Sequence, residues 1–216
     1  MDLRGVRGGD HRVSRSGAGG PPHGRRGRRI ARPVTGLRPL TTDDAAAVRR
    51  VYSGAAVAFL GRAGMGGQEA VEYVARVREW ATADPVVQYV LGVEVDGDLV
   101  GVVKLGRRSG GHGRVSYVLR EDRWRSGHAT SAVRLLVSFA FGAGGFTSLG
   151  ARRHPDNGAS GRVLEKAGFT RVGWCGGMVE YRLAAPERGV SPGGRTPAAS
   201  TARPGRPSPP WTCSCG

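Results

Sequence analysis

Residues that can form a hydrophobic core are confined to the middle of this chain. Of its 216 residues, the first 35 include eight Gly and three Pro, and residues 186–216 include seven Pro and five Gly. Segments of this composition bury too little apolar surface to offset the entropy that they lose on ordering. We therefore expect disordered tails at 1–35 and 186–216 around one domain at 36–185, whose length of about 150 residues suffices for a core.

The excess of positive charge lies mainly in these two ends. The formal net charge is +16, of which residues 1–35 carry +7 and residues 186–216 carry +3. Basic segments attract phosphates, so one hypothesis is that the tails dock nucleic acid or a ribosome. The first tail has no aromatic residue to stack on bases, which weighs against a nucleic-acid arm. A start codon assigned upstream of a true start near Val34 is the alternative explanation of this tail.

Several classes of protein are disfavoured by the composition. The sequence has no run of 18 apolar residues and no basic segment followed by a long apolar stretch, so we expect no membrane span and no secretory signal. The expected location is the cytoplasm. The three cysteines, Cys175, Cys213 and Cys215, match no four-ligand zinc spacing, and we expect reduced thiols and no metal site.

The first part of the domain predicts a short strand and two helices. Leu37 begins the strand, and Thr42 is the expected N-cap of a helix to about Ser53, because two aspartates follow in its first turn. A second helix ends before Asp84-Pro85, since proline disfavours helical geometry in the residue that precedes it. The apolar face of this helix consists of Tyr73, Val74, Val77, Trp80 and Ala81.

The remainder predicts a sheet with two more helices. Residues 88–95 and 99–105 form a hairpin around Asp96-Gly97-Asp98, a turn that needs positive φ. The apolar stripe at 129–141 predicts the clearest helix of the chain. The other expected elements are strands at 115–119 and 146–151, a helix at 157–167, and strands at 170–174 and 178–183. Their sum is a mixed α/β fold with a mostly antiparallel central sheet, helices on both faces, and one parallel pair joined by a helical crossover.

The junction ahead of the helix at 129–141 predicts an anion site. The segment Arg125-Ser-Gly127-His-Ala129 opens directly into the helix, so several backbone N–H groups point at one spot. Gly127 and Ala129 let a ligand approach the backbone, and Arg123 and Arg125 add countercharge. The spot suits a pyrophosphate, but such junctions occur in many α/β proteins and do not identify a function by themselves.

Three stretches carry a resemblance to a known family. Ser116-Tyr-Val-Leu119 resembles the strand whose backbone runs beside the pantetheine arm of CoA, and Trp124-Arg-Ser-Gly-His-Ala-Thr130 looks like the pyrophosphate loop R/Q-x-x-G-x-G/A. The stretch from Asn157 to Phe169 is similar to the N-x-x-S-x-x-x-L-x-K-x-G-F signature at the thiol end. These features resemble the GNAT superfamily of N-acetyltransferases over residues 36–185, and within it the ribosomal-protein N-terminal (alanine) acetyltransferases of the RimJ and RimL kind.

The resemblance implies roles for particular residues. The N–H groups of Val118 and Leu119 are expected to bond the pantetheine and to polarise the acetyl carbonyl. Ser160 and Asn157 are the expected catalytic residues, with the Ser160 hydroxyl protonating the leaving thiolate; the alternative for Ser160 is a serine that caps backbone donors at a helix N-terminus. The residues implied to bind acetyl-CoA are Val118, Leu119, Arg125, Ser126, Gly127, His128, Ala129, Thr130, Asn157 and Arg162.

Two positions depart from the family pattern. Trp124 stands where the loop usually has Arg or Gln, and binding is expected to survive because the position contributes a backbone group. Arg114 stands where many relatives have a glutamate, so the sequence identifies no general base. Replacements considered are His112, Glu94 and Glu72, none of which the sequence selects, because a base must first be positioned near the proton that it removes.

The absence of a base bears on the acceptor. A protein α-amine has a pKa near 7.8, whereas a lysine amine has a pKa near 10.4, so the α-amine is far more often neutral at neutral pH. This favours N-terminal peptides or small-molecule amines of low pKa over lysine side chains. The acidic residues Glu69, Glu72 and Glu79 are candidates for attracting a cationic acceptor, although a solvated helix face is the better explanation of them.

The function expected from these residues is transfer of an acetyl group from acetyl-CoA to a primary amine, by direct attack in a ternary complex and without a metal. The alternative within enzymes is an antibiotic or polyamine acetyltransferase on the same scaffold. The alternative from another class is a catalytically silent acyl-CoA-binding domain whose basic tails dock nucleic acid or a ribosome.

Overall fold

The computed structural model describes residues 35–186, so the predicted tails lie outside the described residues except for Thr35 and Pro186. The strands are β1 (Thr35–Pro39), β2 (Gln88–Val95), β3 (Asp98–Arg107), β4 (His112–Leu119), β5 (Ser148–Arg153), β6 (Thr170–Cys175) and β7 (Met178–Ala184). The α-helices are α1 (Ala45–Val51), α2 (Gly67–Thr82), α3 (His128–Phe141) and α4 (Gly158–Lys166). Short 3-10 helices lie at η1 (Thr42–Asp44), η2 (Gly54–Val57), η3 (Ser109–Gly111) and η4 (Glu121–Arg123).

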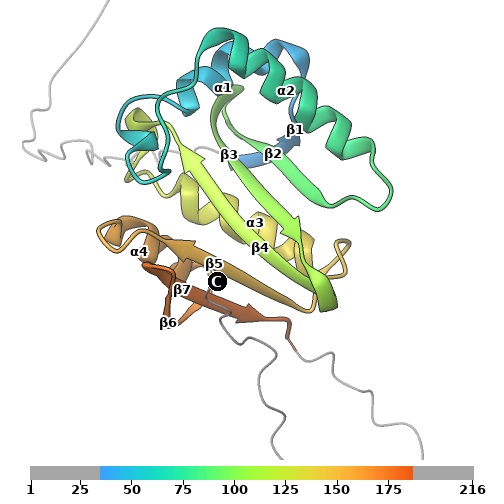
Figure 1. Ribbon diagram of the computed structural model, residues 1–216, viewed down its shortest axis with the longest axis vertical. Helices are drawn as coiled ribbons and strands as arrows, with labels where there is room; N and C mark the ends of the chain where they lie inside the picture. Colours follow the sequence, from blue (N-terminus) through green and yellow to red (C-terminus); the bar gives the residue numbers. More distant parts are fainter. Residues whose placement is uncertain (1–34, 187–216) are drawn as a thin grey trace, which may run out of the picture. The chain divides into compact units, whose positions relative to one another are not determined.

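The seven strands form one sheet in the order β1-β2-β3-β4-β5-β7-β6 (Figure 1). All neighbouring strands are antiparallel except β4 and β5, which are parallel and joined through α3. The predicted hairpin is confirmed: Val95 pairs with Asp98 across a two-residue turn in which Asp96 and Gly97 have φ of 50° and 81°. The predicted mixed, mostly antiparallel α/β fold is therefore confirmed.

Each face of the sheet has its own hydrophobic core. One core joins β2–β5 and β7 to the apolar stripes of α3 and α4, which Figure 1 shows behind β4 and beside β5. The other core joins β2, β3 and β4 to α1 and α2. Because successive side chains of a strand point to opposite faces, β4 contributes Val115 to the first core and Val118 to the second. Helices thus cover both faces, as expected.

Some local details differ from the sequence-based predictions. The first helical segment is capped by Thr41, one residue before the predicted cap, because the Asp44 carboxylate accepts hydrogen bonds from the Thr41 N–H (2.7 Å) and hydroxyl (3.1 Å). In α2 the buried positions include Ala70, whereas Ala81 is exposed, because the helix has nearly ended there. Cys175 is disulfide-bonded and not the reduced thiol that we expected.

No helix among residues 35–186 is both long and apolar enough to cross a membrane.

A buried carboxylate fastens β1 to the first helical turn. Asp44 accepts two hydrogen bonds from the Arg38 guanidinium, at 2.7 Å and 2.8 Å, and the Nε of Arg38 donates to Glu94 on β2. The Arg38 hydrogen bond is the main reason that the pKa of Asp44 falls from 3.8 to about 2. A paired, buried carboxylate of this kind connects the edge of the sheet to the helices that cover it.

We expect Asp44→Asn to lower the free energy of unfolding at pH 7 by about 2 kcal/mol, since a carboxylate with a depressed pKa stabilises the fold above its unfolded pKa. This stabilisation is lost as the pH falls from about 4 toward 2, so the variant and the wild type should converge there. Denaturant unfolding at several pH values measures this, with the exposed neighbour Asp43→Asn as the control. An equal difference at pH 7 and pH 2 would contradict the assignment.

Candidate active site

The parallel strands β4 and β5 separate halfway along their length. They pair only from His112 to Val115 on β4 and from Ser148 to Ala151 on β5. Beyond this point β4 stays paired with β3 as far as Leu119, while β5 stays paired with β7. Figure 1 shows the two strands together at one end and apart at the other. The end of β4 therefore has an open edge in the middle of the sheet.

The backbone groups on this open edge follow from the register. The Arg120 N–H donates to the carbonyl of Val100 on β3 (2.9 Å). Since alternate residues of an antiparallel strand turn to the same neighbour, the N–H of Val118 also faces β3, and the N–H groups of Tyr117 and Leu119 face the gap toward β5. Of the two predicted pantetheine donors, the register brings Leu119 to the gap and turns Val118 away from it.

The loop after β4 is tied back to the open edge. The indole Nε1 of Trp124 donates a hydrogen bond to the carbonyl of Leu119 (3.0 Å), and the Ser126 hydroxyl donates to the carbonyl of Trp124 (3.3 Å). Arg125 is exposed and has a φ of 62°. The tryptophan that departs from the family pattern thus holds the loop against the end of β4 through its side chain.

The N-terminus of α3 is open to an anion. Gly127 is the N-cap with a φ of 83°, and no side chain of the described residues caps this helix. The Ser131 N–H donates to the Gly127 carbonyl (3.0 Å), which is the first hydrogen bond within the helix. The N–H groups of His128, Ala129 and Thr130 therefore have no carbonyl partner within the helix. At the positive end of the helix dipole these three donors favour an anion such as a phosphate.

Side chains near this helix end divide into buried and exposed groups. His128 is buried, and its Nδ1 lies 3.1 Å from the Thr35 hydroxyl on β1, which leaves its backbone for a ligand. Arg123, expected to supply countercharge, instead pairs with Asp98 (3.0 Å). Arg162 is exposed on α4. Arg125 and Arg162 are therefore the predicted cations that remain available at the surface.

The two predicted catalytic residues, Asn157 and Ser160, lie beside a tyrosine that the sequence analysis did not identify as functional. Asn157 is the N-cap of α4, and its Oδ1 accepts a hydrogen bond from the Ser160 N–H (3.0 Å). The Tyr117 hydroxyl lies 2.8 Å from the Ser160 hydroxyl and donates to the Ser160 carbonyl (2.9 Å). Burial raises the pKa of Tyr117 to about 12, so the phenol is protonated at neutral pH. The hydroxyl groups of Tyr117 and Ser160 therefore form a linked pair between β4 and α4.

A signal for Tyr117 was present in the sequence. It lies in the same Ser116–Leu119 stretch that resembles the family, within the strand predicted at 115–119. Its pairing with Ser160 spans 43 positions of the chain and depends on how α4 packs, which spacing alone does not give.

None of the three acid–base candidates considered from the sequence faces the gap. His112 lies where β4 and β5 are still paired, and its Nδ1 contacts the hydroxyl of Ser148. Glu94 is bonded to Arg38 on β1, and Glu72 accepts a hydrogen bond from the Gln68 amide on the outer side of α2. A carboxylate or imidazole base is thus not supplied by these positions.

A small cavity adjoins the open strand on the face covered by α1 and α2. Its volume is about 210 Å³, and it is lined by Tyr52, Leu60, Arg62, Tyr73, Val102, Lys104, Ser116, Tyr117 and Val118. Because Ser116 to Val118 belong to β4, the cavity reaches the strand that carries the open edge. A molecule in it would approach the edge from the side opposite α3 and α4.

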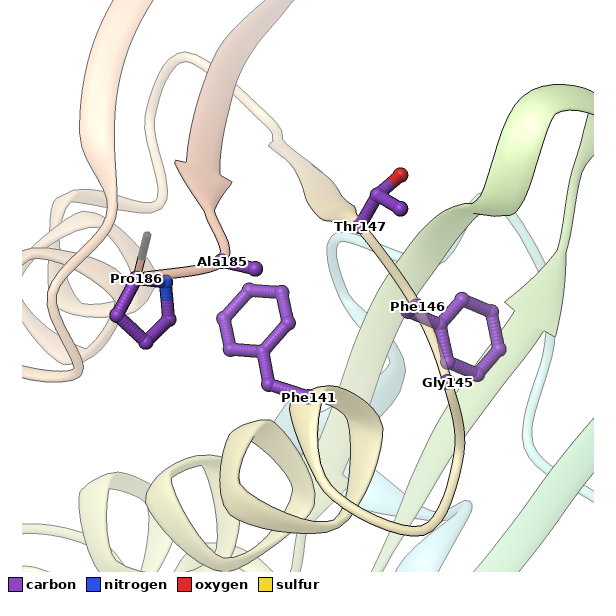
Figure 2. A pocket seen from close by; sticks show the side chains of 6 residues that line it. All are labelled: Phe141, Gly145, Phe146, Thr147, Ala185 and Pro186. Atoms are coloured by element: carbon purple, nitrogen blue, oxygen red, sulfur yellow. The ribbon is translucent and has the colours of Figure 1, made fainter. Parts of the chain in front are cut away.

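A second cavity, of about 300 Å³, lies elsewhere (Figure 2). It is lined by Phe141, Gly145, Phe146, Thr147, Ala185 and Pro186. Phe141 is the last residue of α3, about 20 Å from the N-terminus of this helix at 1.5 Å per residue, so this cavity is separate from the candidate site.

The arrangement combines three capacities. The α3 N-terminus accepts an anion, the open edge of β4 offers hydrogen bonds to an extended amide chain, and the Tyr117–Ser160 pair offers a proton. Within residues 35–186 no group of three His, Cys, Asp or Glu side chains is placed to hold a metal ion.

Comparison with known proteins agrees with this geometry. The family model described as an acetyltransferase (GNAT) domain matches residues 35–170. The uncharacterized N-acetyltransferase YoaA of Bacillus subtilis (strain 168) is 33% identical over 78 residues, which are 35% of this chain and 44% of YoaA. The chain thus matches less than half the length of that relative.

Solved structures share the fold at lower identity. Mycobacterium smegmatis RimJ in complex with CoA-disulfide has a TM-score of 0.60 at 24% identity, covering 73% of this chain and 85% of RimJ. Spermidine N-acetyltransferase from Vibrio cholerae, in complex with CoA and spermine, has a TM-score of 0.61 at 13% identity, covering 70% of this chain and 95% of that enzyme.

Because the family model spans more than half of the chain, the protein belongs to the GNAT acetyltransferase family. The resemblance to the GNAT superfamily found in the sequence is thereby confirmed, and the solved structures that share the fold include a RimJ.

The contact between Tyr117 and Ser160 is testable without any ligand. We expect Tyr117→Phe and Ser160→Ala to show a coupling free energy of about 0.5–1.5 kcal/mol in a double-mutant cycle, because either change removes the same hydrogen bond. Denaturant unfolding of the four proteins measures it. Additive effects would show that the two hydroxyl groups do not interact in solution.

Proposed function

We propose that the protein is an acetyl-CoA-dependent N-acetyltransferase that acts on a primary amine by direct attack in a ternary complex. The observation that carries this proposal is the open edge of β4, which carries Tyr117 of the Tyr117–Ser160 pair and leads after Leu119 into the loop before the α3 N-terminus. Membership of the GNAT family and the CoA-bound structures of relatives support the same cofactor.

In this proposal the cofactor lies along three sets of groups. The pyrophosphate is held by the N–H groups of 128–130 at the start of α3, with Arg125 as countercharge. The amide groups of the pantetheine pair with the backbone of β4 in place of the missing strand. The N–H of Leu119 polarises the acetyl carbonyl, a role that the register favours over Val118.

The reaction then follows with balanced protons and electrons. The neutral amine attacks the acetyl carbonyl, its lone pair forms the new C–N bond, and negative charge collects on the oxygen beside Leu119. The oxyanion re-forms the carbonyl as the C–S bond breaks, and the thiolate takes a proton from the Ser160 hydroxyl. Tyr117 returns a proton to Ser160 and is itself reprotonated from solvent. The attacking nitrogen releases its extra proton to solvent. Asn157 acts by holding Ser160 at the start of α4.

The acceptor class follows from the missing base. Glu94, Glu72 and His112 are engaged away from the gap, so an amine that is already partly neutral at pH 7 reacts most readily. This favours a protein N-terminal α-amine or a small-molecule amine of similar pKa over a lysine side chain.

The silent acyl-CoA-binding domain remains the alternative function. Docking of nucleic acid or a ribosome through the basic tails is a prediction that lies outside the described residues. The two functions differ in whether CoA is released when an amine is added.

Binding of the cofactor should raise the melting temperature. At a hundredfold excess of acetyl-CoA over its dissociation constant, we expect about 2.7 kcal/mol of stabilisation, or about 5 to 10 °C for a domain of this size. Differential scanning fluorimetry of the full chain with and without acetyl-CoA measures this. The absence of any shift would count against the cofactor site.

Release of CoA should depend on an amine and on the hydroxyl pair. We expect Ser160→Ala to lower kcat by about 100-fold, because a positioned general acid contributes on that order, and Tyr117→Phe to lower it in the same direction. Matched controls are Ser138→Ala, on the exposed end of α3, and Tyr89→Phe, which packs against Phe139. A thiol assay of CoA release with N-terminal peptides measures the rates; unchanged rates in Ser160→Ala and Asn157→Ala would overturn the site assignment.

A further inference from the structure

The cavity beside β4 is lined by positive charge. Its wall contains two cationic residues, Arg62 and Lys104. It contains no Asp or Glu from residues 35–186. Arg62 is already paired, since its guanidinium lies 2.5 Å from the Glu69 carboxylate on α2. The glutamate that we considered as an attractor of cations is therefore neutralised beside this cavity.

Lys104 has no such partner. Within the described part of the chain its ammonium makes no ion pair and no hydrogen bond, and it lies against the rings of Tyr52 (5.4 Å) and Tyr73 (5.1 Å). Burial, with a smaller effect of Arg62, lowers the pKa of Lys104, as expected for an ammonium that lacks a counterion. An anionic ligand in the cavity would supply that counterion.

Two phenols complete the donor set. The hydroxyl groups of Tyr52 and Tyr73 lie 3.4 Å apart, and burial raises the pKa of both, so both are protonated at neutral pH. When one phenol donates to the other, the second keeps its proton for a ligand. The cavity thus offers an ammonium and a phenol O–H, which together suit a carboxylate.

The positive charge continues outside the cavity on the same face of the sheet. Arg114 on β4 and Arg152 on β5 have the strand parity that places them on the face opposite the core under α3 and α4. Burial lowers the pKa of Arg114, and the charges of Arg152 and Arg108 lower it further. Among the described residues, Glu180 is the acidic residue beside them, 3.9 Å from Arg152. Glu180 also lies 3.8 Å from Arg182, and Arg152 donates a hydrogen bond to the Sγ of Cys175 (3.0 Å), so among the described residues this surface keeps an excess of positive charge.

The position of Lys104 relative to the reacting groups fits a short peptide. Lys104 pairs with Ser116, three residues before Leu119, which is about 10 Å along the strand. The cavity of about 210 Å³ holds about seven water volumes, enough for one small side chain. The amine and a carboxylate of the next residue can therefore be bound at the same time, while the following residues lie over Arg114 and Arg152.

Resting on the acetyltransferase function proposed above, we propose that the acceptor is a peptide N-terminus followed by acidic residues, with the first carboxylate bound by Lys104, Tyr52 and Tyr73. The later carboxylates lie on the arginine surface formed by Arg114 and Arg152. Polyamines and aminoglycosides, which are polycations, are disfavoured by the same charges.

The test compares acceptors that differ only in charge. The peptides are Ala-Glu-Glu-Ala, Ala-Gln-Gln-Ala and Ala-Lys-Lys-Ala with free N-terminal amines. As small-molecule acceptors, β-alanine and β-alanine amide are compared in the same assay. We expect kcat/KM for the acidic peptide to exceed that for the Gln peptide by about 10- to 100-fold, as for charge-assisted hydrogen bonds, and to fall with added salt. A preference for β-alanine over its amide, without one among the peptides, would assign the cavity to a small acid and overturn the peptide proposal.

Variants of Lys104 test the source of the preference. Lys104→Met should reduce the ratio of acidic to Gln peptide toward one, Lys104→Arg should retain most of it, and Arg49→Met, which removes an exposed charge from α1 outside the cavity, should leave it unchanged. The shift in melting temperature with acetyl-CoA verifies that each variant folds and binds cofactor. An unchanged ratio in Lys104→Met would overturn the proposal.

Binding separates this inference from the proposed function. Calorimetric titration of the acidic and Gln peptides into the CoA-loaded protein needs no turnover. If no peptide releases CoA but the acidic one binds more tightly, the recognition site stands and the catalytic proposal fails. If amines are acetylated but both peptides bind equally, the enzyme stands and the acidic acceptor is refuted.

Discussion

The separation of β4 and β5 after four residue pairs is the constraint on which the site depends. A strand edge inside a sheet exposes backbone donors and acceptors that ordinarily pair with a neighbouring strand. Here β4 remains paired with β3 as far as Leu119 while β5 pairs with β7, and the chain that leaves β4 at Leu119 enters α3 at His128. The open edge and the anion-binding end of a helix therefore lie close together, which is an arrangement suited to a long ligand with phosphates at one end.

The two faces of the sheet divide the remaining tasks. The side of α3 and α4 carries the linked hydroxyl groups, because the Tyr117 hydroxyl on β4 contacts that of Ser160 on α4. The side of α1 and α2 carries the cavity of Lys104 and the two phenols. Relatives of this fold include a RimJ and a spermidine N-acetyltransferase, so the scaffold does not define an acceptor. We propose that the charge of the cavity wall is the property of this chain that distinguishes between such acceptors.

Sequence patterns located most of the elements and part of the site. The period of 3.6 in 129–141 gave α3 to within a residue, and the Asp96-Gly97 turn gave the β2–β3 hairpin, since both depend on contacts between close neighbours in the chain. The stretch that begins at Asn157 was found through its spacing, and Asn157 is the N-cap of α4. The cap at Thr41 was displaced by one residue because a side-chain contact with Asp44 decided between adjacent threonines.

Only the tertiary structure identified the partners of individual polar groups. Alternation along a strand gives two faces and two hydrogen-bonding edges but does not say which neighbour lies on each edge, so only the β3 register turned Leu119 and not Val118 to the gap. Tyr117 and Lys104 looked like ordinary strand residues until helices from distant parts of the chain brought Ser160 and Tyr73 to them. The sequence by itself determined the elements and the family, because these depend on local periodicity and spacing; the packing of distant segments decided the chemistry of the site.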